Sequence, residues 1–305
     1  MLHRRLLLAA AATLALAAPS VAAETGAAWK AKYPELVYAI IPAENSGTVL
    51  DRWTPFVDYL SKELGTRVTL RVANDYAAVI EGQRSGNIHI AQYGPASYAR
   101  ARMTGVKIEP FAIEVNPDGT RGYYSVLWTK AGSPYQKIED LKGKNLCLVD
   151  PNSTSGNNVP RFAMSKMGIE PNKFFGKVVY AGSHENVIFA INQGTCDAGF
   201  NLWVSDTEST LQRMAAKGAV KADDFRIIFR SEQIVNSPVA YLTDLPEDLR
   251  KAISAAVVSM PQKAPDVLKK IFDGKGGSYQ PVDHKAYEPI VQLNGFVDTL
   301  RKKRS

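Results

Sequence analysis

The stretch N-L-C-L-V-D-P-N-S-T-S-G, residues 145–156, changes from an apolar run to a cluster of hydroxyl residues. Its apolar half is typical of a buried strand, and the hydroxyl residues Ser153, Thr154 and Ser155 are typical of a helix start. The proline and the glycine in this stretch mark the turn between strand and helix. Because one hydroxyl is enough to cap a helix, three together indicate a second role. We interpret the segment as a turn that offers hydroxyl and free backbone N–H groups to an anion.

Strand and helix patterns alternate on both sides of this stretch, which is typical of an α/β protein with mostly parallel sheets. Before it, the pattern predicts strands at 36–42, 67–73 and 88–93 and helices at 51–64 and 76–84. From 145 onward, it predicts strands at 145–149, 177–180 and 196–200 and helices at 156–167 and 184–192. A further amphipathic helix is expected at 287–300.

The predicted strands and helices before residue 145 and those after it follow the same order. Tyr76 and His184 stand at equivalent places in them, and so do Gly86 and Gly194, with the same separation for both pairs. A repeated plan of this kind indicates two lobes of like topology. In α/β sheets, ligands bind beyond the carboxyl ends of the strands, where helix N-termini favour anions. Two such lobes that face each other would form a cleft lined by helix starts.

Two turn-rich segments are the candidates for crossings between the lobes. V-N-P-D-G-T-R-G-Y (115–123) and R-S-E-Q-I-V-N-S-P (230–238) contain proline or glycine among polar residues. We therefore predict one lobe formed by residues 24–121 plus 233–305 and a second lobe formed by residues 122–232. A pair of crossings predicts a hinge, with closure over a ligand as the expected motion.

The first 23 residues have the features of a secretory signal peptide. Arg4 and Arg5 precede a short apolar run, and small residues lead up to Ala23. The alternative is a membrane anchor, but the apolar run is too short to span a bilayer. We predict cleavage near Ala23, export to the periplasm and no stable membrane insertion.

The composition is that of a globular protein, with 45% hydrophobic and 22% charged residues. The formal net charge of +7 is spread along the chain, and only the tail R-K-K-R (301–304) is a basic cluster. A basic tail can contact nucleic acid or anionic lipid, but a solvated terminus is the commoner case. We expect no nucleic acid partner.

Cys147 and Cys196 are the two cysteines of the chain. In an exported protein such a pair can form a disulfide, and both lie in apolar, strand-like runs. The alternative is two buried free thiols. The four histidines and two cysteines show no metal-ligand spacing, so we expect neither a metal nor another cofactor.

Several motifs resemble those of the periplasmic phosphonate- and phosphite-binding proteins that serve ABC importers. They are W-T-P-F (53–56), N-D-Y-A-A-V-I-E-G (74–82), A-Q-Y-G (91–94), G-Y-Y-S-V-L (122–127), D-P-N-S-T-S-G (150–156) and A-G-S-H-E-N (181–186). The resemblance extends over most of the chain. It implies a type II binding-protein fold with two lobes, a hinge and a central ligand cleft. It also implies that an ABC permease and its ATPase are partners.

By motif, the resemblance assigns the phosphorus oxygens of the ligand to two tyrosines, the Ser-Thr-Ser turn and a histidine. These residues are Tyr76, Tyr93, Ser153, Thr154, Ser155 and His184. The physical pattern agrees, because Tyr76 and His184 stand at predicted helix starts and Tyr93 ends a predicted strand. The set contains no Lys or Arg, which suits a protein that must release its anion. The sequence leaves the protonation state of His184 open.

One departure from the family concerns the carboxylates that would hold a ligand amine. Val204 and Ser237 occupy the two positions in an ungapped comparison, although Asp206 would serve if the loop is gapped differently. A site without such acids would favour phosphite, methylphosphonate or a related small species, and Trp203 or Tyr124 would wall off the phosphorus substituent. Asp206 close to the anion would select a ligand that keeps a P–OH proton.

Two other function classes stay open. Ser153 or Ser155, with His184 and Asp206, has the composition of a nucleophilic triad, although no G-x-S-x-G motif is present. Three adjacent hydroxyls favour a binding site, so we expect no enzyme. The same donors would also suit a sulfonate or a carboxylate, or a protein that presents its ligand to a sensor in place of a permease.

Overall fold

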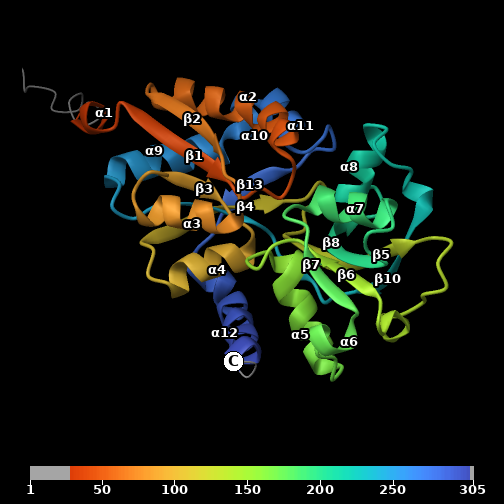
Figure 1. The fold of residues 1–305 in the computed structure, drawn as a ribbon. Coiled ribbons are helices and arrows are strands. Elements are labelled where there is room, and N and C mark those ends of the chain that lie inside the picture. Colours follow the sequence, from red (N-terminus) through yellow and green to blue (C-terminus); the bar gives the residue numbers. More distant parts are fainter. Residues whose placement is uncertain (1–27, 303–305) are drawn as a thin grey trace, which may run out of the picture.

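The computed structural model describes residues 28–302. The predicted signal segment 1–23, its cleavage position at Ala23 and the last residues of the basic tail lie outside the described residues. Two β-sheets with their helices form two lobes that lie side by side (Figure 1). The predicted α/β class with two lobes is therefore confirmed.

The sheet of the first lobe has the strand order β13-β4-β12-β3-β1-β2. Its strands are β1 (Glu35–Ile40), β2 (Arg67–Val72), β3 (Ile90–Gln92), β4 (Ile108–Val115), β12 (Pro238–Leu242) and β13 (Ser278–Pro281). β1 is parallel to β2 and β3, whereas β12 is antiparallel to both β3 and β4. The prediction of mostly parallel sheets is therefore wrong for this half of the sheet.

The sheet of the second lobe has the main order β10-β5-β8-β6-β7, with β11 paired to β5 and β9 paired to β8. Its strands are β5 (Gly122–Lys130), β6 (Asn145–Leu148), β7 (Lys177–Tyr180), β8 (Ala198–Ser205), β9 (Glu208–Ser209), β10 (Phe225–Arg230) and β11 (Ile234–Val235). β6 is parallel to β7 and β8, and β5 is antiparallel to β8 and β10. Both lobes thus combine parallel strand pairs with antiparallel strands, among them β4, β5 and β12 next to the crossing segments.

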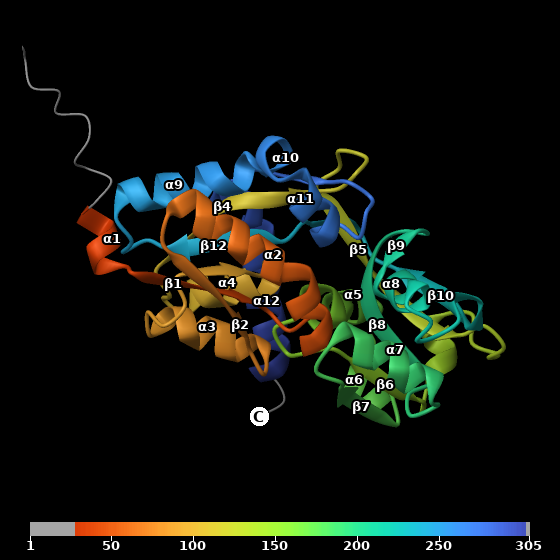
Figure 2. The ribbon, with the colours of Figure 1, turned by 90° about the horizontal axis from the view of Figure 1, so that it is seen from above.

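Helices cover both faces of the first sheet (Figure 2). They are α1 (Ala28–Lys32), α2 (Ser46–Leu64), α3 (Tyr76–Arg84), α4 (Pro95–Met103), α9 (Glu247–Val258), α10 (Met260–Lys263), α11 (Pro265–Ile271) and α12 (Glu288–Lys302). Successive residues of β1 point to opposite faces. Tyr38 packs in the cluster that contains residues of α2 and α9, and Ala39 in the cluster that contains residues of α3 and α4.

The second lobe has fewer helices among its described residues. They are a single π-helical turn (Thr154–Asn158), α5 (Val159–Lys166), α6 (Pro171–Phe174), α7 (His184–Asn192) and α8 (Thr210–Ala216). Short 3₁₀ turns lie at Ile138–Leu141 and Ala222–Asp224 in this lobe and at His284–Tyr287 before α12. The predicted helix 156–167 therefore begins earlier, as a π turn that includes Thr154 and Ser155.

The repeated plan predicted from the sequence appears in α3 and α7. Each begins at the predicted residue, Tyr76 or His184, and has a side-chain cap directly before it, from Asp75 or Ser183. Gly86 and Gly194 follow the two helices with nearly identical φ values of 77° and 76°. This left-handed region favours glycine, which explains why both lobes keep it there.

The chain passes between the sheets twice, from β4 to β5 and from β10 to β12. The two segments lie side by side, because Asn236 donates its backbone N–H to the Arg121 carbonyl and its side-chain amide to the Glu114 carbonyl. These are the segments in which the sequence places the crossings. The lobe boundaries of 24–121 plus 233–305 and 122–232 stay a prediction.

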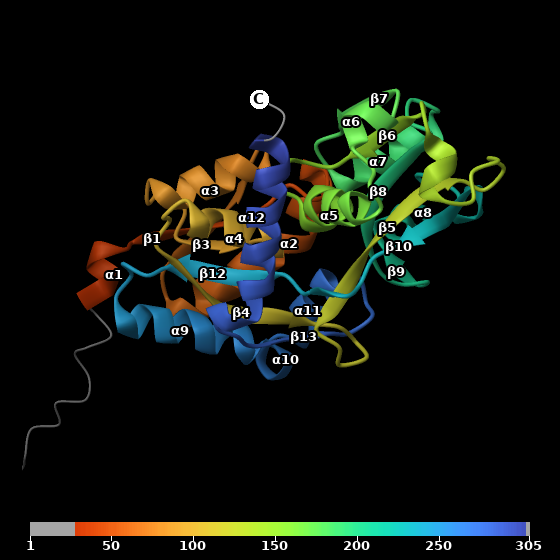
Figure 3. The same cartoon turned by 90° about the horizontal axis from the view of Figure 1, so that it is seen from below.

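Three further observations complete the description of the fold. A disulfide joins Cys147 of β6 to Cys196, the second residue before β8. Helix α12 lies along both lobes, beside α4 and α5 (Figure 3). Between residues 28 and 302, no helix combines the length and the hydrophobicity that a membrane span needs.

Candidate functional site

A cavity of about 150 Å³ lies between the lobes. The first lobe contributes the ends of β1 and β3, part of α2 and the start of α3; the second contributes the 153–155 turn, the start of α7 and part of β8. Six of the predicted ligand-binding residues line it: Tyr76, Tyr93, Ser153, Thr154, Ser155 and His184. The structure therefore brings together residues that are far apart in the sequence.

The Ser-Thr-Ser turn is held so that its hydroxyl hydrogens are available to a ligand. Ser153 caps the π turn, and its Oγ accepts the Gly156 N–H at 3.1 Å. Thr154 Oγ1 accepts the Ala96 N–H from α4 of the first lobe at 2.8 Å. Both hydroxyl oxygens thus accept from the backbone, so each O–H is directed to a neighbouring tyrosine hydroxyl or to a ligand. A Cβ on Gly156 would lie 2.3 Å from Val149 Cγ2, so this tight turn requires glycine.

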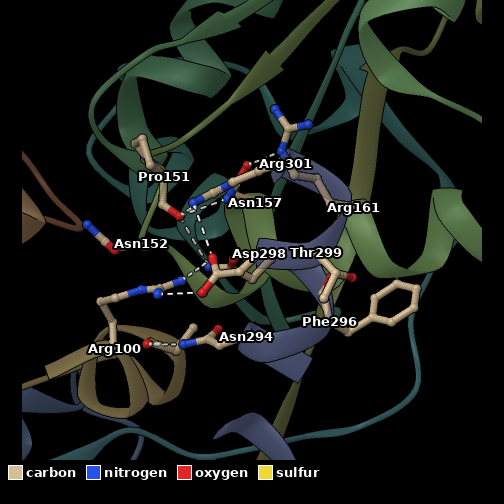
Figure 4. A network of polar contacts seen from close by, with 12 residues as sticks. Arg100, Pro151, Asn152, Asn157, Arg161, Asn294, Phe296, Asp298, Thr299 and Arg301 are labelled. Carbon is tan, nitrogen blue, oxygen red and sulfur yellow. Dashed lines mark hydrogen bonds and ion pairs between the residues drawn. The ribbon is translucent and has the colours of Figure 1, made fainter. Parts of the chain in front are cut away.

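The peptide before the turn is fixed by a polar network (Figure 4). The Pro151 carbonyl accepts hydrogen bonds from the side-chain amides of Asn157 and Asn158 and from Arg301 Nη2 of α12. Arg161 in turn donates Nε–H to Asn157 Oδ1 at 2.8 Å. Residues of α5 and α12 therefore support the geometry of the ligand turn.

Two buried tyrosines present hydroxyls to this turn. Tyr76 begins α3 and interacts with Ser153; burial and then Asp150 raise the pKa of Tyr76 above its ordinary value. Tyr123, in β5, is buried too, which raises its pKa, while hydrogen bonds with Thr154 and Ser155 act in the opposite direction. Sequence reasoning missed Tyr123 as a site residue, although it lies in the motif G-Y-Y-S-V-L.

The hydroxyl of Tyr93 has a partner inside the first lobe, and its predicted role toward a ligand stays a prediction. Its ring lines the cavity, but its hydroxyl donates to Gln83 Oε1 of α3 at 2.8 Å. A phenol has a single hydrogen to donate, so Tyr93 cannot also donate to a ligand in this arrangement. Tyr123 also lines the cavity, and its hydroxyl interacts with the Ser-Thr-Ser turn instead.

His184 is buried at the start of α7, with its backbone N–H bonded to the Ala43 carbonyl of the first lobe. Its Nδ1 lies 2.9 Å from Oδ1 of Asn201 in β8. Burial lowers the pKa of His184 to about 4; the hydrogen bond with Asn201 opposes this shift and Arg213 adds to it. The ring is therefore neutral near neutral pH.

Asp206 does not join the other predicted residues. It is exposed in the turn between β8 and β9 and is not among the residues that line the cavity. Trp203 and Tyr124 contact each other at 5.6 Å between ring centroids, with Arg230 over both rings, and neither lines the cavity. The apolar wall instead includes Ile40, Ile41, Val49, Trp53, Ile271 and Phe272.

Charged side chains that the sequence analysis did not find line part of the same cavity. Arg52 of α2 and Arg213 of α8 both pair with Glu44, and both also lie within 4.0 Å of Asp273. Burial alone would raise the pKa of Glu44, but the two arginines hold it below its ordinary value. These residues come from separate elements with no shared motif, so no local pattern in the sequence predicts that they meet.

Two further carboxyl groups, Glu114 and Glu208, line the cavity. Burial raises the pKa of Glu114 to about 7, although Gln92 donates its side-chain amide to it. Val204 and Ser237, at the two positions where the family has carboxylates, line the cavity, and Glu44, Glu114 and Glu208 place carboxyl groups on its wall from other positions.

Comparisons with known proteins agree with this geometry. Residues 38–287 match the family described as the periplasmic substrate-binding protein of a phosphonate ABC transporter. The chain is 31% identical over 248 residues to a phosphate-import protein PhnD from Mycolicibacterium smegmatis, covering 78% of this chain and 76% of that protein. It is 33% identical over 225 residues to a phosphonates-binding periplasmic protein from Escherichia coli, covering 72% of this chain and 64% of that protein.

A solved structure is also similar over most of the chain. The binding protein component of an ABC phosphonate transporter from Pseudomonas aeruginosa has a TM-score of 0.78 and 27% identity, with 86% of each chain covered. PhnD1 from Prochlorococcus marinus, solved in complex with methylphosphonate, has a TM-score of 0.76 at 21% identity over 87% of this chain and 98% of that one, and so shows the fold alone. On this evidence, the chain belongs to the family of periplasmic substrate-binding proteins of phosphonate ABC transporters.

Proposed function

We propose that this protein captures a small phosphorus oxyanion for an ABC importer. The ligand class comprises phosphite, methylphosphonate and related phosphonates, and the cavity between the lobes is the binding site. The observation that supports this proposal is the convergence of uncharged donors from both lobes, with Tyr76 on one side and the 153–155 turn on the other. Arg52 and Arg213 also line the cavity, where both pair with Glu44, and the proposal assigns the anion to the uncharged hydroxyl and backbone N–H groups.

Its partners in this role are the permease and ATPase subunits of the transporter. Its place is the periplasm, with the segment 1–23 removed near Ala23. The N-terminal mass of the exported protein tests this part of the proposal, because cleavage after Ala23 leaves Glu24 as the first residue.

The experiment that tests the ligand class is a binding panel on the purified mature protein. Calorimetry and thermal unfolding are measured with phosphite, methylphosphonate, aminoethylphosphonate and phosphate. A ligand at about 100 times its Kd stabilises the folded protein by about 2.7 kcal/mol. Sulfonates and carboxylates are the comparison ligands. If a carboxylate raised the unfolding temperature and no phosphorus compound did, the proposal would be wrong.

Aminoethylphosphonate has particular value in this panel. The sequence favours ligands without an amine because the two family positions that would hold an amine have no carboxylate. Glu44, Glu114 and Glu208 line the cavity, however, and could pair with an amine. The order of affinities between methylphosphonate and aminoethylphosphonate therefore tests the small-ligand preference directly. Tightest binding of the amine compound would exclude that preference and leave the ligand class intact.

The site is proposed to bind and not to catalyse. In a nucleophilic triad the His Nδ1–H is oriented by a carboxylate. Here Asn201 occupies that place, while Asp206 is exposed on a turn outside the cavity. We expect no turnover of esterase or phosphatase substrates, and we expect Ser153→Ala to weaken ligand binding. Steady turnover that Ser153→Ala abolished would contradict this assignment.

A further inference from the structure

The hydrogen bonds of Asn201 fix the tautomer of His184. The Asn201 side-chain Nδ2–H donates to the His184 carbonyl at 2.8 Å, and its Oδ1 accepts the Leu202 N–H at 2.9 Å. These two bonds determine which end of the amide is oxygen. The atom that meets His184 Nδ1 at 2.9 Å is therefore an acceptor, so Nδ1 must have the hydrogen.

His184 is buried, and its Nδ1 partner is an uncharged amide and not a carboxylate, which favours the neutral ring. A neutral imidazole has one N–H, so Nε2 of His184 has a lone pair. Because Nδ1 is occupied by Asn201 and His184 lines the cavity, Nε2 is the ring nitrogen left for a ligand. The charged groups that act on the ring are Arg213 of α8, which favours the neutral form, and Glu44, which opposes it. Glu185, next along α7, is directed to Asn45 and Thr48 instead.

The neighbours of His184 in the turn are donors. Ser153 and Thr154 each accept a backbone N–H, and their hydroxyls also interact with those of Tyr76 and Tyr123. Each pair of hydroxyls has two hydrogens and uses one between its members, so one is left to donate to a ligand. A fully deprotonated phosphonate has only acceptors and would meet the Nε2 lone pair with another lone pair. A monoanion has one P–OH group. This group can donate to the one acceptor, His184 Nε2, while the other phosphonate oxygens accept from the donors of the site.

We propose that the site selects the singly protonated monoanion of a phosphonate or of phosphite. The P–OH group donates to His184 Nε2, and Asn201 is the positioning residue that keeps this nitrogen an acceptor. The inference deepens the proposed function and rests on it. It names the protonation state of the ligand that the cavity takes.

The first test uses the unmodified mature protein and two ligands of the same shape. Methylphosphonate has a P–OH group in its monoanion, whereas methanesulfonate is a monoanion with no hydrogen to donate. We expect methanesulfonate to bind at least about tenfold more weakly, the cost of one lost hydrogen bond to a charged partner. We expect methylphosphonate affinity to fall about tenfold per pH unit above the second pKa of the ligand, because binding then requires uptake of a proton.

The pH dependence of methanesulfonate binding is the internal control, since it reports protein groups such as Glu114 that titrate in the same range. Equal affinity for the two ligands, or methylphosphonate binding with no fall at high pH, would overturn the inference. Failure of both ligands to bind would contradict the proposed function itself, so the two outcomes are distinguishable.

The second test changes the positioning residue by Asn201→Asp. A carboxylate next to Nδ1–H favours the imidazolium, so Nε2 becomes a donor. We expect methanesulfonate to bind more tightly than in the unmodified protein, and the preference for methylphosphonate to narrow by at least about tenfold. A structural role alone would weaken both ligands by the same factor, and that result would overturn the role given to Asn201.

A third measurement is independent of that variant and of its folding. Nitrogen-15 NMR of the unmodified protein distinguishes a neutral imidazole from an imidazolium at His184. With methylphosphonate bound near neutral pH, we expect one protonated and one unprotonated ring nitrogen. Two protonated ring nitrogens in the complex would show that the ligand binds as a dianion to a charged histidine, which would overturn the inference.

Discussion

At the scale of single residues, the site depends on which hydroxyl hydrogens are already used inside the protein. The hydroxyl of Tyr93 donates to Gln83, so it serves the fold of the first lobe. The hydroxyl of Tyr123 interacts with Thr154 and Ser155 in the second lobe, beside the place of the anion. Two buried tyrosines that line one cavity thus have separate roles, and they form a matched pair for mutation.

Tyr123→Phe removes a donor from the ligand site and leaves the ring in place. A hydrogen bond to a charged group contributes about 1.5–3 kcal/mol, so we expect methylphosphonate to bind about tenfold to about a hundredfold more weakly. The free energy of unfolding should change little, because Thr154 and Ser155 keep their backbone contacts. Calorimetry and denaturant unfolding measure the two quantities.

The control is Tyr93→Phe, which leaves Gln83 Oε1 buried without its donor. We expect this variant to lose about 1–3 kcal/mol of stability and to keep its affinity within about threefold. The reverse pattern, in which Tyr93→Phe loses affinity and Tyr123→Phe does not, would restore Tyr93 as the ligand donor and contradict the assignment made from the hydrogen bonds.

The same scale shows what the sequence could and could not predict. The donors at helix starts follow from local patterns, and Tyr76, His184 and the Ser-Thr-Ser turn lie where the motifs place them. Glu44, Arg52 and Arg213 have no such pattern, because they meet only after the lobes are assembled. Asp206, whose assignment depended on where the loop is gapped, lies on an exposed turn and is not among the residues that line the cavity.

At the scale of elements, local chemistry predicted helices better than it predicted sheets. α3 and α7 have their predicted bounds because each has its own cap. α2 begins five residues before the predicted Asp51, at Ser46, where Glu185 of the other lobe accepts the Asn45 N–H and the Thr48 hydroxyl. Such a contact between lobes, like the antiparallel strands at the crossings, leaves no local trace in the sequence.

Helix α12 contacts both lobes on the side of the molecule away from the cavity wall. Toward α4 of the first lobe, its Asp298 pairs with both terminal nitrogens of Arg100, at 2.7 Å each. Toward the second lobe, Phe296 contacts Phe162 at 5.3 Å between ring centroids, and Arg301 donates to the Pro151 carbonyl (Figure 4). The contacts with the second lobe exist only while the lobes are together.

We therefore expect the double variant Phe296→Ala/Arg301→Gln to disfavour the closed arrangement. Loss of an aromatic contact and of one charged hydrogen bond is worth about 2 kcal/mol, or about thirtyfold in ligand affinity. Calorimetry measures the affinity, and solution X-ray scattering measures the radius of gyration without ligand, which should increase. Thr299→Ala, on the exposed face of the same helix, is the control. Unchanged affinity in the double variant would show that α12 only packs on the surface.

At the scale of the whole molecule, the structure has the lobes in contact around the cavity. The Ala43 carbonyl accepts from the His184 N–H, and Thr154 accepts from Ala96. Glu185 accepts from Asn45 and Thr48 at the start of α2. None of these bonds needs a ligand atom, so the protein itself supplies part of the free energy of closure. A ligand needs to add only the difference between the open and the closed states.

Glu185 is the residue that best tests how much of the free energy of closure comes from the protein itself. Its side chain bonds to the other lobe, whereas its neighbour His184 lines the cavity. Glu185→Ala removes two hydrogen bonds that exist only in the closed state. We expect ligand release to become about tenfold to about a hundredfold faster, with an association rate within about threefold of the original, because capture occurs in the open state. Stopped-flow fluorescence measures both rates, with Trp53 in the cavity wall as the reporter.

The control is Glu185→Gln, which keeps an acceptor oxygen. Its ligand release rate should lie between those of the unmodified protein and of Glu185→Ala. An association rate reduced as much as release is accelerated would mean that α7 itself is disturbed, and a release rate that did not change would show that closure depends on the ligand alone.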